Sequence, residues 1–274
     1  MQFINTVKKA LALSTGIYLS SLALSPVYAQ SDIDVRKIVK ESELASYYAG
    51  DDGRSMARMV IVDANGNSQI RQFIILRKDI EDGKDQELMV FFSRPADVRD
   101  TVFRVVKHTQ TDDDRWLYLP GLDLVKRISA GDKRTSFVGS HFFYEDVSGR
   151  NTELDDYELV EELESSYRIK GTPKDPSTVE FDHYFVNIDK ATKIPLEVDF
   201  YDSKDRLYRK VSAVKVEEIE GIPTVVHSRV EDVLNGGATE MQFRFVDYNL
   251  GLPNDIFSER SLRTPPRDWL KITN

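Results

Sequence analysis

The side chains that could carry chemistry are few in this sequence, and they lie far apart. The four histidines are His108, His141, His183 and His227. No two of them have the local spacing of metal ligands, and the chain has no cysteine that could complete a set. Three consecutive aspartates at 112–114 begin like a calcium loop but lack its alternating ligands and its distal Glu. We therefore expect no metal site and no cofactor.

A serine next to a histidine is the strongest hint of catalysis. Ser140 and His141 follow Gly139, but a nucleophile elbow needs G-x-S-x-G between a strand and a helix, and the sequence does not have that pattern here. We therefore expect that the protein is not an enzyme. An esterase remains an alternative, and it would need a buried Ser-His-acid cluster around these residues.

The aromatic side chains are a better guide, with 14 Phe, 12 Tyr and 2 Trp in the chain. In the stretch 112–151, large apolar residues alternate with small and charged ones. This composition suits a shaped apolar surface better than a reaction centre. The residues that we expect to line an apolar cavity are Trp116, Leu117, Leu119, Phe137, Phe142, Phe143, Phe73, Ile75 and Phe91.

A group of basic residues lies in the same stretch. Lys126, Arg127, Lys133 and Arg134 are predicted to form a rim beside the cavity. Such a rim would meet anionic lipid headgroups or an acidic partner protein. Solvated surface charge is the alternative interpretation of these residues.

The elements that must position these side chains are mostly β-strands. From Ser55 onward apolar residues recur with a period of two, and Asn65-Gly66 predicts a β-hairpin. Strand-like segments follow one another with short turns and no crossover helices, which predicts a mainly β (α+β) fold with an antiparallel sheet. Before them, Ser31 or Asp32 can cap an amphipathic helix that runs to about Tyr48.

Two later segments are predicted to be helical. The apolar residues of 137–143 do not alternate, which indicates a short helical turn. Residues 254–262 are predicted to form a short terminal helix, capped at Asn254 or started by Pro253.

Some strands are apolar at consecutive positions, so neither of their faces can meet water. This holds for 73–76 and 90–92, whereas 183–189 and 197–202 alternate as half-solvated strands do. A curved sheet explains both patterns, because its concave face wraps an apolar interior while a helix or loop covers part of its convex face. That interior is either filled by side chains or holds an apolar ligand.

Length and charge limit the classes of function. The chain has 274 residues, and we expect 30–274 to form a single domain. Its net charge of -9 argues against nucleic-acid binding, because phosphate contacts need a basic face.

The N-terminus has the layout of a secretory signal peptide. Lys8 and Lys9 precede an apolar run, and Val27-Tyr28-Ala29 offers a cleavage site, so we expect removal of residues 1–29. Polar residues interrupt the run too often for a membrane span of ~20 apolar residues. Without a cysteine the protein cannot carry a lipoprotein's lipid. We therefore expect a soluble, periplasmic protein that is not lipidated.

A set of short motifs follows in order after residue 29. They are Pro95, Thr101-Val102-Phe103, Trp116-Leu117-Tyr118-Leu119-Pro120, Arg127-Ile128, Ser136-Phe137-Val138-Gly139-Ser140, Phe142, Tyr144-Glu145-Asp146, the segment from Leu252 to Ser258, and Pro265-Pro266. In these motifs the sequence resembles the LolA-like superfamily of outer-membrane lipoprotein-sorting proteins. It departs from that pattern at Asp100, where the family tends to have Gly, and at His141, where it tends to have Asp. Neither is an apolar position, so the expected fold is unaffected.

The resemblance implies an unclosed antiparallel β-barrel with helices covering its open mouth and an apolar cavity for acyl chains. It also implies a carrier that binds a lipoprotein or another lipid, and an inner-membrane RND-type transporter as a partner. The alternative is a periplasmic accessory protein that docks on such an exporter without binding lipid. A filled interior would favour the accessory protein, and an open cavity of several hundred Å³ would favour the carrier.

Overall fold

The computed structural model describes residues 33–81 and 83–272. The chain divides into two units, Met1–Ile33 and Asp34–Asn274. Every described helix and strand belongs to the second unit. The predicted signal peptide and the predicted helix caps Ser31 and Asp32 lie outside the described residues. No described helix is long and apolar enough to cross a membrane.

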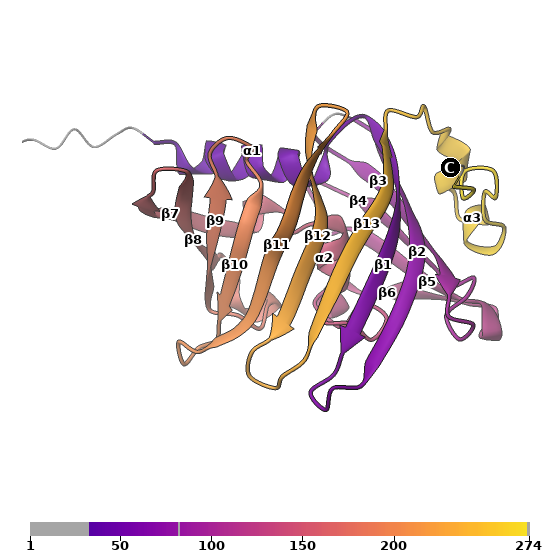
Figure 1. Cartoon of the computed structure of the whole chain (residues 1–274), viewed down its shortest axis with the longest axis horizontal. Coiled ribbons are helices and arrows are strands. Elements are labelled where there is room, and N and C mark those ends of the chain that lie inside the picture. The colour runs from indigo at the N-terminus through magenta and orange to yellow at the C-terminus, as the bar shows by residue number, and fades with distance from the viewer. Residues whose placement is uncertain (1–32, 82, 273–274) are drawn as a thin grey trace, which may run out of the picture. The chain divides into compact units, whose positions relative to one another are not determined.

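The second unit is built on an antiparallel sheet of 13 strands that curves but does not close (Figure 1). The strand order is β6-β5-β4-β3-β2-β1-β13-β12-β11-β10-β9-β8-β7, so the first and last strands pair in the middle and β6 and β7 are the free edges. The mainly β, unclosed antiparallel prediction is confirmed. The strands are β1 Asp52–Val62, β2 Ser68–Asp79, β3 Gln86–Arg94, β4 Val102–Lys107, β5 Asp114–Leu119, β6 Leu124–Ile128, β7 Asp155–Glu162, β8 Ser166–Pro173, β9 His183–Asp189, β10 Pro195–Tyr201, β11 Leu207–Ile219, β12 Ile222–Asp232 and β13 Ala238–Tyr248.

The helices are short apart from the first. Turns of 3-10 helix, among them Asn254–Phe257, connect some of the strands. The α-helices are α1 Val35–Tyr47, α2 Tyr144–Ser148 and α3 Arg260–Arg263.

The predicted hairpin is present. β1 and β2 pair from Asp52 with Lys78 to Val62 with Ser68. In the turn between them, the Asp63 carboxylate accepts the backbone N–H groups of Asn65 and Asn67, each at 2.9 Å. Gly66 takes a positive φ of 83°, which glycine adopts at little cost.

The N-cap of helix α1 lies two residues after the predicted Asp32 and three after the predicted Ser31. The Asp34 side chain accepts the Lys37 backbone N–H at 3.1 Å, which makes Asp34 the N-cap. The helix buries Ile38 and Val39 and runs across the end of the sheet from β7 to β12 (Figure 1).

Two of the predicted helical segments take other forms. Residues 137–143 form a tight loop: the Phe137 N–H donates to the Phe142 carbonyl at 2.7 Å, and Val138 and Gly139 have positive φ. A bridge between Ser136 and Phe143 closes it. The terminal segment is split into the 3-10 turn Asn254–Phe257 and the single turn of α3.

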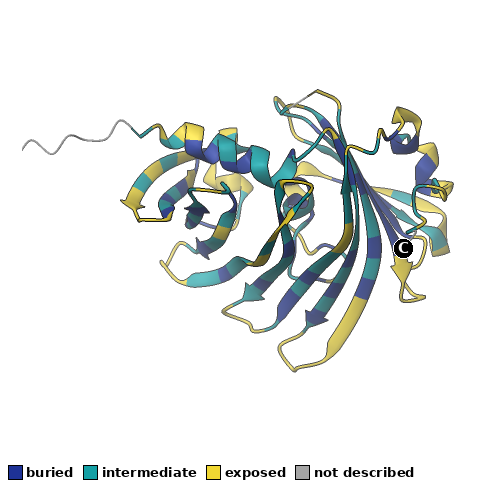
Figure 2. Cartoon of the chain, turned by 45° about the horizontal axis from the view of Figure 1, so that its top comes forward, coloured by how far each residue is buried: buried dark blue, intermediate teal, exposed yellow. Residues whose placement is uncertain are grey.

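Each face of the sheet carries its own apolar cluster, because successive residues of a strand point to opposite sides. In β3, Val90 and Phe92 belong to the concave cluster, whereas Met89 and Phe91 belong to the convex one. The convex cluster is completed by residues from the C-terminal segment, including Phe257. The buried bands of both faces are visible in Figure 2. This arrangement explains why consecutive positions of β3 are apolar.

Candidate ligand cavity

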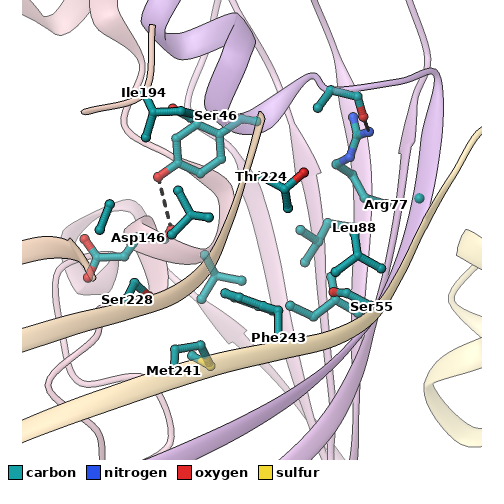
Figure 3. A pocket seen from close by; sticks show the side chains of 18 of the residues that line it. Ser46, Ser55, Arg77, Leu88, Asp146, Ile194, Thr224, Ser228, Met241 and Phe243 are labelled. Carbon is teal, nitrogen blue, oxygen red and sulfur yellow. Dashed lines mark hydrogen bonds between the residues drawn. The ribbon is translucent and has the colours of Figure 1, made fainter. Parts of the chain in front are cut away.

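A cavity of about 340 Å³ lies between α1 and the concave face of the sheet (Figure 3). Its walls come from α1, from β1, β2 and β3, from the α2 region and from β11, β12 and β13. Its volume is at the lower end of the ~300–1,000 Å³ range of ligand pockets. The concave interior of the sheet is therefore not completely filled by the chain's own side chains.

The deep wall of the cavity is apolar. Met241 and Phe243 project from β13, and Leu88 projects from β3, as Figure 3 shows. Phe73 of β2 and Phe137 lie edge to face, with ring centroids 6.3 Å apart. These five side chains carry no charge, so the surface that they form suits apolar ligand atoms.

The loop that carries Phe137 and Phe142 is held against the sheet by polar contacts. The His141 backbone N–H donates to Thr239 Oγ1 at 3.0 Å, and His141 Nδ1 lies 2.8 Å from the same oxygen. Asp146 accepts the Phe143 backbone N–H at 2.6 Å. These contacts fix the aromatic part of the cavity wall.

The end of the cavity beside α1 is polar. Arg54 donates to Asp247 Oδ2 from Nη2 at 2.6 Å and from Nε at 3.1 Å. Arg77 donates to Asp79 at 2.7 Å. Burial lowers the pKa of Arg77, and the neighbouring Asp79 opposes that shift. The cavity is thus apolar at depth and polar at its opening, as an amphiphile would require.

Several contacts hold the C-terminal half of α1 over the cavity. Gln86 Nε2 donates to the Tyr47 carbonyl at 2.8 Å, and Arg77 Nη2 donates to the Gly50 carbonyl at 2.8 Å. Tyr48 donates its hydroxyl to the Lys84 carbonyl at 2.7 Å. Burial, reinforced by nearby carboxylates, raises the pKa of Tyr47, so its hydroxyl stays protonated.

The structure divides the nine residues predicted for the cavity into three groups. Phe73, Ile75, Phe137 and Phe142 line it. Leu117 and Leu119 belong to the concave cluster but not to the cavity lining.

The third group lies elsewhere. Phe91 and Trp116 point to the convex side, where they pack with the C-terminal segment. Phe143 lies under the guanidinium groups of Arg134 and Arg209, whose centres are 5.0 and 4.4 Å from its ring centroid. Trp116 and Leu117 could not both face the cavity, because neighbours in a strand point to opposite faces.

The four predicted rim residues do not form one surface, which corrects that expectation. Lys126 and Arg127 are exposed on the edge strand β6. The side chains of Lys133 and Arg134 are only 8% and 7% exposed, and both pair with the buried Glu145. Burial alone would raise the pKa of Glu145, but the charges of its basic neighbours hold the pKa below its usual value. Lys133 and Arg134 therefore act in an internal ion-pair network.

The residues considered for catalysis are engaged separately. Ser140 Oγ donates to the Phe142 carbonyl at 3.4 Å, while the His141 ring contacts Thr239. The described residues contain no group of three or more His, Asp or Glu side chains that could hold a metal ion.

Sequence reasoning missed most of the cavity wall. Met241, Phe243 and Val211 line it, and the alternation in MQFRF at 241–245 was the signal that could have found two of them. The contribution of α1 through Ala45 and Ser46 had no such signal, because these residues are small.

Comparisons with known proteins agree with this architecture. A family model described as an uncharacterized protein matches residues 84–264. A DUF1329 family protein from Desulfovibrio piger is 31% identical, with a TM-score of 0.76, over 83% of this chain and 97% of that one. The curated proteins give no match.

Two further crystal structures share the fold. A proposed outer membrane lipoprotein-sorting protein domain from Vibrio parahaemolyticus is 26% identical, with a TM-score of 0.76, over 83% of this chain and 97% of that one. A LolA superfamily protein from Nitrosomonas europaea is 16% identical, with a TM-score of 0.63, over 83% of this chain and 99% of that one.

Proposed function

The chain belongs to the DUF1329 family and has the fold of the LolA superfamily, and from this we propose that it is a lipid carrier. The carrier binds the acyl chains of a lipoprotein or another lipid in its cavity and passes its cargo toward the outer membrane. It acts by shielding hydrocarbon from water and not as an enzyme.

The observation that supports this proposal best is the cavity within the concave apolar cluster. An acyl chain gains ~0.8 kcal/mol for each CH₂ that it buries, so several methylenes provide useful affinity. Such a ligand needs no directional partner at depth. Polar groups at the opening, including Arg54 and Asp247, can form hydrogen bonds with the polar end of such a ligand.

The cellular setting is part of the proposal. The carrier is a soluble, non-lipidated periplasmic protein that loses residues 1–29 as a signal peptide and keeps 30–274 as its single domain. An inner-membrane RND-type transporter is the partner that would load or unload it. The alternative, an accessory protein that docks on such an exporter and binds no lipid, would have been favoured by a filled interior.

Native mass spectrometry of the protein purified from its own cells tests the carrier. We expect a bound lipid or acylated protein at a stoichiometric level. In Phe243→Glu, a carboxylate replaces an apolar part of the cavity wall, and the cargo should be lost because burying an unpaired charge is costly. Ile70→Glu is the matched control, since Ile70 is 42% exposed and does not line the cavity.

The opposite outcome is equally clear. A wild-type protein that carries no cargo and takes up no fluorescent fatty acid would contradict the carrier and favour the docking protein. Equal cargo in wild type and in folded Phe243→Glu would place the lipid outside this cavity.

A further inference from the structure

The sheet is split at one end between β12 and β13. In the described residues their register runs from Glu231 with Ala238 to His227 with Gln242 and stops there. Beyond that point residues 222–225 of β12 pair with β11, and residues 243, 244, 247 and 248 of β13 pair with β1. These two segments do not pair with each other, and we call the boundary between them the β12–β13 seam. Figure 1 shows the end of β13 diverging from the β11–β12 hairpin.

The cavity reaches this seam. Pro223, Thr224 and Val225 all line it, although consecutive strand residues point to opposite faces of a sheet. Val246, Asp247 and Tyr248 do the same on the other side. These residues belong to the parts of β12 and β13 that do not pair with each other. The cavity therefore extends to the facing edges of β12 and β13 beyond the end of their ladder.

Among the described residues, one side-chain hydrogen bond crosses the seam. Thr224 Oγ1 lies 2.8 Å from the Tyr248 hydroxyl, so the two groups share a hydrogen bond across the gap. Each backbone pair of an intact ladder would contribute hydrogen bonds of its own. A single bridge of this kind opens at a low cost, because a hydrogen bond has a small net effect on stability.

A β-bulge shapes the outer side of the seam. The β1–β13 register moves from Arg54 with Asp247 to Met56 with Arg244, so that Ser55 faces two residues of β13. One of these is Phe245, which has a φ of 51° and is 44% exposed. A positive φ is unusual for an aromatic residue. The bulge thus presents an exposed apolar ring next to the opening.

The other boundary of the cavity is much more firmly held. The end of α1 is fixed by the contacts of Gln86, Arg77 and Tyr48 described above. In the middle of the helix, Glu43 pairs with the buried Lys107 at 3.6 Å. Lifting α1 would break this buried ion pair and three part-buried hydrogen bonds together, whereas opening the seam breaks the part-buried Thr224–Tyr248 hydrogen bond. The seam is the easier way in.

We infer that the β12–β13 seam is the portal through which an acyl chain enters the cavity sideways, while the polar end of the amphiphile stays outside. This inference rests on the proposed carrier function and adds the route and the orientation of the ligand. At the portal, the Arg54–Asp247 ion pair offers partners to the polar end.

A reversible crosslink across the seam tests the portal. The chain has no cysteine, so Thr224→Cys with Tyr248→Cys creates a unique pair for a short thiol-cleavable crosslinker. Uptake of a fluorescent long-chain fatty acid is then followed by stopped-flow fluorescence. We expect the crosslink to slow uptake about tenfold or more, and reduction to restore the rate.

A control pair separates the portal from the effect of crosslinking itself. Tyr118→Cys with Val125→Cys joins residues that face each other in the β5–β6 ladder, away from the cavity. Its crosslink should leave uptake unchanged. Equal slowing by both crosslinks would overturn the inference.

The remaining outcomes show whether the portal proposal fails alone or together with the proposed carrier function. If wild-type protein binds the fatty acid and the seam crosslink does not alter uptake, the portal is wrong and the carrier stands. If wild-type protein binds none, both are wrong.

A milder variant pair opens the seam instead of closing it. Thr224→Val with Tyr248→Phe removes the bridging hydroxyls and keeps the shapes. Association and dissociation rates should both rise about fivefold, equivalent to ~1 kcal/mol, with little change in affinity. Tyr118→Phe is the control, because its hydroxyl bonds to Asp123 outside the cavity. Unchanged rates in the seam variant would contradict the portal.

Discussion

The two faces of the same sheet are both apolar, yet the chain completes them differently. On the convex side Leu252, Phe257 and Leu262 of the C-terminal segment are 0%, 0% and 2% exposed against β2, β3 and β4. On the concave side Ile75 and Phe243 stay partly exposed around a cavity. Alternating strand residues supply both surfaces, so the difference lies in what covers them.

This contrast is compatible with the proposed carrier, because one face stabilises the sheet while the other is left incompletely packed. The convex cluster is closed by the chain itself and anchored by buried polar contacts, such as Arg104 Nε donating to the Phe257 carbonyl at 2.6 Å. The sheet can then leave its concave face incompletely packed without losing its form. Under the proposed function, a ligand would bury this apolar surface and gain the corresponding free energy.

The largest expected effect is on the convex side. Phe257→Ala should lower the free energy of unfolding by about 3–5 kcal/mol, because the ring is completely buried. Phe243→Ala, at the partly exposed cavity wall, should cost no more than about half of that. Urea denaturation measures both. Equal losses would contradict the division between a structural face and a ligand face.

The anchor of the C-terminal segment should matter next. The buried Asp52 carboxylate accepts the backbone N–H groups of Leu250 and Leu252, each at 2.6 Å. Asp52→Asn should lower the free energy of unfolding by about 1–3 kcal/mol, because the amide NH₂ of Asn would face one of these two backbone N–H groups and could not accept its hydrogen bond. The exposed Asp51→Asn is the matched control. Fatty-acid binding at low temperature should survive in both variants.

Filling the cavity should make the two faces alike. Val211→Phe adds a ring to the β11 wall of the cavity. We expect the affinity for a fluorescent fatty acid to fall about tenfold or more, with the unfolding free energy changed by no more than ~1 kcal/mol. Retained affinity would show that the ligand binds elsewhere.

The smallest expected effect concerns pH and the loop that carries Phe142. Burial lowers the pKa of His141; Asp232 opposes this shift and Arg209 adds to it. A depressed folded-state pKa gives stability that is present above the unfolded value near 6.5 and is lost as pH falls through the folded value. Thermal unfolding at pH 7.5 and pH 5 should therefore show a larger loss for wild type than for His141→Gln. A larger loss in the variant would contradict this assignment.

Local sequence patterns predicted the frame of the fold. The Asn65-Gly66 turn and the alternation around it gave the central hairpin, and the consecutive apolar residues 90–92 gave a sheet covered on both faces. Both depend on residues close in the chain, which is why they could be predicted. The loop at 137–143 could not, because the long-range contact with Thr239 holds it.

The cavity was predicted less completely, for a physical reason. Alternation shows that Phe91 and Phe92 point to opposite faces, but it does not show which face the C-terminal segment will cover. The fate of Arg134 depends on Glu180, 46 residues away, which it contacts at 2.7 Å. A charge run therefore could not be recognised as an internal network.

Photoaffinity mapping tests the central claim most directly. A long-chain fatty acid with a diazirine near its methyl end is bound to the protein and activated, and the labelled peptides are sequenced. We predict labels on concave residues of the cavity wall, such as Met241 and Phe243, and none on Trp116 or Phe257. Labels confined to the convex side, or no specific label at saturation, would contradict the division between the two faces.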